Sequence, residues 1–171
     1  MKNFTKLFAL AFVMIGFTTI ASAQTTSPAA AASATVITPI TVSKTTDLSF
    51  GNLAVQSATG GTLVLTPAAG RSATGGVTLP AVTGTVAAAT FKVDGEGTSA
   101  YSITLPTASF NLTSGLNTMA VGSFTSTPSA NGALVAGTQN VNVGATLTVA
   151  AAQAAGSYTN TADLKIIVNY N

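Results

Sequence analysis

The sequence predicts an all-β fold, a β-sandwich whose strands are joined by Greek-key connections. Roughly eight to ten segments alternate apolar and polar residues with the period of two that a strand on a core requires. Turn-forming residues separate these segments, and no stretch after residue 23 sustains a helical period. Many short strands divided by turns are typical of a sandwich, and a closed barrel is the second architecture that the pattern allows.

The first 23 residues are expected to form an export signal. Lys2 and Lys6 precede an apolar run that begins at Leu7, and Ala21–Ala23 offers a cleavage site before Gln24. The run is shorter than the about 20 residues that a membrane span needs, so an anchor is the weaker alternative. We therefore expect export to the periplasm or cell surface of a Gram-negative bacterium, with no integral membrane span after cleavage.

The rest of the chain divides into two parts. Residues 24–33 are rich in alanine and lack large apolar groups, so a flexible mature N-terminus is expected there. Residues 34–171 have the length of a single β-sandwich domain. The chain has no cysteine, so this domain has no disulfide to stabilise it.

The composition excludes several classes of function. Loss of Lys2 and Lys6 with the signal leaves four basic residues against four acidic ones, which gives no basic surface for nucleic acid. With no His and no Cys, the chain lacks the usual general base, the thiolate nucleophile and the ordinary zinc ligands. Asp94 and Glu96 are too few for calcium, which takes about six to eight oxygen ligands. Neither enzymatic activity nor a cofactor is expected.

The first expected strand starts at Ala34. Val36, Ile40 and Val42 share one face of this segment. Pro39 cannot donate a ladder hydrogen bond, so the segment is predicted to lie at a sheet edge.

The next segments combine strands with glycine turns. Asp47–Gly51 points Leu48 and Phe50 inward and ends in an expected bulge, while Lys44 falls in a turn before it. Asp47 is expected to accept hydrogen bonds from nearby backbone amides. A short duplication follows, in which Ser57–Gly61 and Ser72–Gly76 are each predicted to form a turn before a strand.

The middle of the chain continues the alternation. Ala89–Val93 and Tyr101–Leu105 are expected strands, with Asp94–Gly97 as the hairpin connection between them. Phe110–Phe124 is assigned one or two short strands. Val141–Val149 alternates without a break and is the clearest strand of the domain.

The chain ends in a predicted long strand. Its apolar face carries Leu164, Ile166, Val168 and Tyr170, and Ile167 is the exception on the polar face. Tyr158, just before it, resembles a tyrosine corner, in which a hydroxyl bonds back to the backbone. The expected core residues are Leu48, Phe50, Leu63, Leu65, Phe91, Ile103, Leu147, Leu164, Ile166 and Val168.

Five short motifs occur in an order that resembles a bacterial family catalogued as domain of unknown function 4402. They are Thr38–Thr41, Asp47–Gly51, Val143–Thr148, Gly156–Tyr158 and Val168–Asn171. The ending is also similar to spore coat protein U and to chaperone–usher pilin subunits, which finish in an alternating strand with a penultimate tyrosine. This resemblance implies an incomplete immunoglobulin-like sandwich.

The resemblance further implies a structural or adhesive surface subunit that assembles by strand donation. Its expected partners are other copies, other surface subunits and a periplasmic chaperone, and its expected subunit contacts are Val36, Ile40, Val42 and Tyr170. Thr35–Val42 is either donated to a neighbour or is the first strand of its own domain. The alternative function is a monomeric secreted or periplasmic binding module, for example for a glycan.

Overall fold

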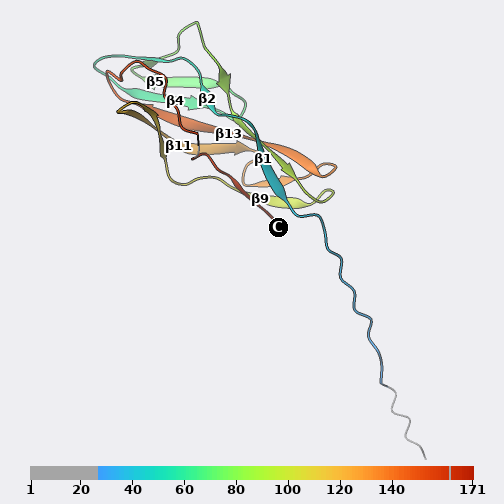
Figure 1. Ribbon diagram of the computed structural model, residues 1–171. Coiled ribbons are helices and arrows are strands. Elements are labelled where there is room, and N and C mark those ends of the chain that lie inside the picture. The colour runs from blue at the N-terminus through green and yellow to red at the C-terminus, as the bar shows by residue number, and fades with distance from the viewer. Residues whose placement is uncertain (1–26, 162) are drawn as a thin grey trace, which may run out of the picture. The chain divides into compact units, whose positions relative to one another are not determined.

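The computed structural model describes residues 27–161 and 163–171, and Val36–Asn171 forms one compact unit (Figure 1). All regular secondary structure in these residues is β-strand. The strands are β1 (Thr41–Thr46), β2 (Ser49–Phe50), β3 (Ala54–Val55), β4 (Gly61–Leu65), β5 (Arg71–Gly75), β6 (Val77–Thr78), β7 (Val86–Ala87), β8 (Ala89–Asp94), β9 (Ala100–Thr104), β10 (Phe110–Ser114), β11 (Asn117–Thr127), β12 (Asn131–Ala133), β13 (Thr138–Val149) and β14 (Ile167–Tyr170).

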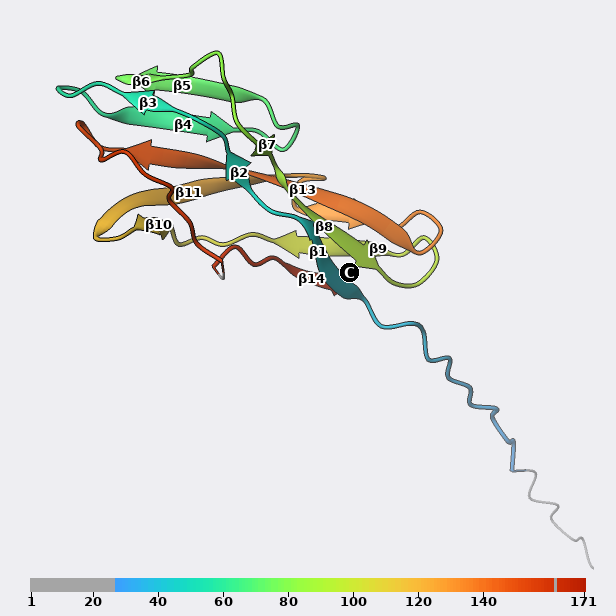
Figure 2. The same cartoon turned by 45° about the horizontal axis from the view of Figure 1, so that its top comes forward.

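The largest sheet is organised around β13. Its strand order is β1-β8-β13-β11-β10, and β4 also pairs with β13 and carries β5 on its other side. The first half of β13 pairs with β8 and the second half with β4, so two shorter strands follow each other along one edge of β13 (Figure 2). Every second residue of β13 from Val141 to Val149 is buried, as its alternation predicts.

A smaller sheet of order β12-β9-β14 and two short ladders, β2-β7 and β3-β6, complete the domain. Successive connections cross between the two larger sheets: β8 leads to β9, β11 to β12 and β13 to β14. This arrangement of antiparallel sheets confirms the predicted all-β sandwich. The predicted signal, residues 1–23, lies outside the described residues.

The core consists of two clusters of buried side chains. One lies around Phe91, Tyr101, Ile103 and Val168, and the other around Leu63, Leu65, Val121 and Leu147. Of the ten core residues expected from the sequence, eight are buried. Leu48 and Leu164 are partly buried against these clusters.

Four expectations about the strands are wrong. The first strand begins at Thr41 instead of Ala34, and Lys44 lies within it instead of in a turn. Asp94–Gly97 is not a hairpin, because β8 and β9 belong to different sheets. The terminal strand spans only Ile167–Tyr170, although its apolar face is correct: Ile166 and Val168 are buried and Ile167 is 59% exposed.

The duplicated glycine segments do not play equal roles. The first copy is a turn before β4, as expected, but the second copy is largely β5 itself, which pairs with β4. Gly61 lies opposite Gly75, and a methyl group on Gly61 would overlap the Thr74 carbonyl. The glycines therefore allow two backbones to approach closely, a use that turn chemistry alone does not predict. At Gly51, where a bulge was expected, the chain leaves β2 with a positive φ of 70°.

Candidate functional site

The four predicted subunit contacts do not form a single apolar row. Val36 is 97% exposed, and Val42 on β1 is 38% exposed. Ile40 and Tyr170 are partly buried and pack against the core cluster around Phe91. Only Val36 has a side chain left almost wholly open to solvent.

Tyr170 instead fastens the start of the domain to the β8–β9 connection. Its hydroxyl donates a hydrogen bond to the Thr38 carbonyl at 2.8 Å and accepts one from the Glu96 amide at 2.6 Å. The Thr38 amide in turn donates to the Glu96 carboxylate at 3.1 Å, and hydrogen bonds from Thr38 lower the pKa of that carboxyl. We call Thr38, Glu96 and Tyr170 the clasp. It holds the backbone at Thr38, directly after the exposed Val36 and Ile37.

β1 is an edge strand, and all six of its residues are exposed. Val42 and Lys44 lie opposite Val93 and Phe91, so they point to the core side of the sheet. Because Val42 is nevertheless 38% exposed, the second layer covers this edge only in part. The expectation of an edge strand is correct, although Pro39 precedes it.

A groove of about 1050 Å³ opens between residues 44–55 on one side and residues 153–161 and Leu164 on the other. Buried core side chains reach its floor, among them Phe50, Phe91 and Leu147. β2 and β3 are only two residues long and each pairs along one edge, while Leu164–Ile166 belongs to no ladder. The wall of the sandwich is therefore made of short strands and irregular backbone here, and the core side chains at the floor keep only a small exposed area.

Tyr158 builds one side of the groove. Its hydroxyl donates to the Ala154 carbonyl at 2.7 Å and accepts from the side-chain Nε2 of Gln153 at 2.8 Å. This return to the backbone four residues earlier confirms the bond predicted for a tyrosine corner. The ring packs against the core cluster around Leu147, so the Gln153–Tyr158 turn is held in place.

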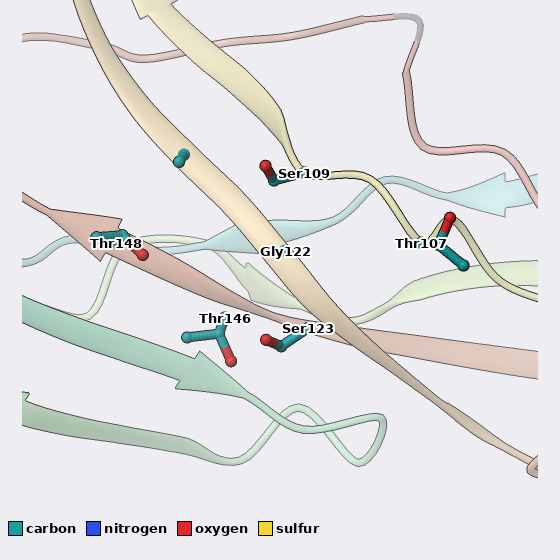
Figure 3. A pocket seen from close by; sticks show the side chains of 7 residues that line it. Thr107, Ser109, Gly122, Ser123, Thr146 and Thr148 are labelled. Atoms are coloured by element: carbon teal, nitrogen blue, oxygen red, sulfur yellow. The ribbon is translucent and has the colours of Figure 1, made fainter.

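A second, smaller hollow of about 300 Å³ lies over β11 and β13 (Figure 3). It forms where β11 carries an irregularity between Gly122 and Thr125, with Ser123 at a positive φ of 49°. Figure 3 shows the short side chains that line it. They are Thr107, Ser109, Ala120, Gly122, Ser123, Thr146 and Thr148.

Two ion pairs join residues that are close in the sequence. Lys92 and Asp94 form an ion pair of 2.8 Å, which together with a hydrogen bond from Thr138 lowers the pKa of Asp94. The Asp47 carboxylate forms an ion pair with Lys44. The expectation that it accepts hydrogen bonds from nearby backbone amides is therefore replaced by this side-chain contact. In residues 27–161 and 163–171, no three acidic side chains gather as a metal site. No helix of the same residues is long and apolar enough to cross a membrane.

Sequence reasoning missed both the clasp and the groove. The clasp joins Thr38, Glu96 and Tyr170, which are 58 and 74 positions apart. A pattern of neighbouring residues cannot predict contacts over such distances in the sequence. The short β2 and β3 could have signalled the groove, since Gly51 and Asn52 interrupt the alternation between them.

Comparison with protein families gives a match to the family described as domain of unknown function (DUF4402), over residues 40–170. Comparisons with curated proteins and with solved structures give no match. The matched range covers most of the chain and runs from Ile40, just after Thr38 of the clasp, to Tyr170. The chain therefore belongs to the DUF4402 family.

Proposed function

We propose that the chain is an exported structural or adhesive surface subunit, and that copies join through the residues before β1. The observation that carries this proposal is the exposure of Val36 and Ile37, at 97% and 49%, directly before an edge strand. Full burial of such a side chain stabilises a contact by about 1.5–3 kcal/mol. A partner that covers both therefore gains a substantial part of its affinity from two residues.

Strand donation is the mode of joining that these residues favour. An added strand is held by backbone hydrogen bonds, while alternate side chains enter pockets. Thr38 is held by the clasp and Thr41–Thr46 pairs with β8 of its own domain, so the donated part ends at Ile37. Val36 then remains the plug, whereas Ile40, Val42 and Tyr170 secure the base of the segment.

The expected partners are other copies, other surface subunits and a periplasmic chaperone that covers the segment before assembly. Export to the periplasm or cell surface follows from the predicted signal. Electron microscopy of secreted material, together with its intact mass, tests this proposal. We expect assemblies whose subunits begin at Gln24. Monomers that keep Met1–Ala23 would contradict it.

A monomeric binding module, for example for a glycan, is the second candidate. The hollow over β11 and β13 favours it, because the hydroxyls of Ser109, Ser123 and Thr146 could bond to a sugar. Replacement of Thr146 with Val removes one hydroxyl at nearly constant shape. Loss of glycan binding in that variant, in a protein that stays monomeric, would favour the binding module over the subunit.

A further inference from the structure

We propose that residues 29–35 are a processing site, at which an endopeptidase with a small side-chain pocket cuts the chain after an alanine. This inference goes beyond the proposed function, because the cut does not require that copies join. Water supplies the atoms: its hydroxyl goes to the carbonyl carbon before the cut bond, and its remaining proton goes to the nitrogen after it. The shortened chain keeps the compact unit Val36–Asn171.

The backbone of this segment is free to enter the cleft of an enzyme. Residues 27–39 are exposed and lie in no strand. Within the described part of the chain, no hydrogen bond joins residues 27–37 to another residue, and the first such contact is the one from the Thr38 amide to Glu96. A cleft that binds an extended peptide uses free backbone N–H and C=O groups, and this segment offers them in an unbroken run.

The side chains of the segment select the class of endopeptidase. Alanine occupies positions 29–32 and 34, and the other two residues are Ser33 and Thr35. No basic, acidic or aromatic residue occurs from Gln24 to Ser43, so an enzyme that requires such a residue before the cut finds none there. A small pocket, like that of an elastase-type serine protease, accepts alanine and excludes larger side chains.

Two prolines and the clasp set the limits of the site. Pro28 precedes it and Pro39 follows it. Proline lacks the backbone N–H that a bound strand donates, and its ring also restricts the residue before it. On the C-terminal side, the hydrogen bonds of the clasp hold both the amide and the carbonyl of Thr38. The bonds after the alanines of residues 29–35 are therefore the accessible ones.

A second alanine-rich stretch, residues 150–155, provides a control within the same chain. All of its alanines are exposed, as in residues 29–35. Its backbone is not extended, because Ala152 has a positive φ of 52° and its amide donates to the Gln56 carbonyl at 3.1 Å. The Tyr158 hydroxyl also holds the Ala154 carbonyl, at 2.7 Å. The two stretches thus share composition and exposure and differ in whether the backbone is free.

Limited digestion with pancreatic elastase tests the proposal. The protein that begins at Gln24 is digested at low concentration, and intact masses locate each cut. We expect the first cut within residues 29–35, at a rate at least tenfold higher than within residues 150–155, because a held backbone is cut only when it opens locally. Equal rates for the two stretches, or a segment 29–35 that resists digestion, would overturn the proposal.

Two variants separate the effect of the backbone from that of the side chains. Tyr158→Phe removes the hydroxyl that holds Ala154, so cutting within residues 150–155 should rise about tenfold and cutting within residues 29–35 should stay unchanged. An equal rise in both stretches would mean that unfolding of the whole protein controls the cut, which would overturn the proposal.

Replacement of the five alanines of residues 29–35 with glutamate keeps the segment exposed but removes the side chains that the small pocket accepts. This variant should be cut there at least tenfold more slowly than the unchanged protein. A rate equal to that of the unchanged protein would overturn the assignment to an enzyme with a small side-chain pocket.

Discussion

Replacement of Tyr170 with Phe should release the N-terminal segment at Thr38 while leaving the rest of the sandwich folded. The substitution removes one hydroxyl and with it the 2.8 Å bond to the Thr38 carbonyl and the 2.6 Å bond from the Glu96 amide. Each such bond contributes about 0.5–1.5 kcal/mol net, so the free energy of unfolding should fall by about 1–3 kcal/mol. The aromatic ring keeps its packing against the core.

Urea denaturation measures this global loss, and hydrogen exchange of the Thr38 amide measures the local one. The matched control is Tyr101→Phe, which loses a single part-buried hydroxyl bond, the one donated to the side-chain oxygen of Gln139 at 2.6 Å. The control should destabilise the protein without a selective effect on Thr38. If the Thr38 amide exchanges equally fast in Tyr170→Phe and in the unchanged protein, the clasp does not hold the segment.

Three further predictions follow from the fold. Ile166→Ala should lower the free energy of unfolding by about 2–5 kcal/mol, whereas Lys165→Ala should lower it by less than about 0.5 kcal/mol. A larger loss for Lys165→Ala than for Ile166→Ala would mean that the face assigned to the last strand is wrong. Gly76→Ala places a methyl group against the Thr59 carbonyl and should cost about 1–3 kcal/mol, so an unchanged urea midpoint would contradict the close approach of the glycine segments. The pKa of Glu96 is lower in the folded protein than in the unfolded chain. The contact between its carboxylate and Thr38 should therefore stabilise the fold fully above the ordinary glutamate pKa of about 4.3, and this stabilisation should be lost as the pH falls through the folded-state pKa. Thr38 amide protection should fall over that acidic range in the unchanged protein, and a flat profile identical to that of Glu96→Gln would refute the carboxylate contact.

The sequence predicts the strands that face the core because apolar alternation is a local property. In β13, Val141, Val143 and Leu147 alternate with polar residues, and all three are buried. The face of the last strand is correct for the same reason. Its length is not, because Leu164 lines the groove instead of pairing with a neighbouring strand.

Connections between sheets depend on residues that are distant in the sequence. The alternation of apolar residues along one strand therefore cannot predict them. Asp94–Gly97 has the composition of a hairpin turn, yet β9 pairs with β14 and β12 instead of with β8. The beginning of β1 was misjudged because the backbone of Thr38 is bonded by Tyr170 and Glu96 and is not in a ladder. Of the predicted contact residues, Val36 has an exposed side chain, as a contact requires, whereas the apolar pattern could not show that Ile40 packs inward.

The most direct test of the central claim compares two lengths of the same protein. One begins at Gln24 and the other at Thr38, so the shorter form keeps the clasp and β1 but lacks the exposed Val36 and Ile37. Sedimentation over a wide concentration range should show assemblies only for the longer form, and folded monomers for the shorter one. Equal assembly of the two forms, or a longer form that stays monomeric at every concentration, would contradict joining through the N-terminal segment.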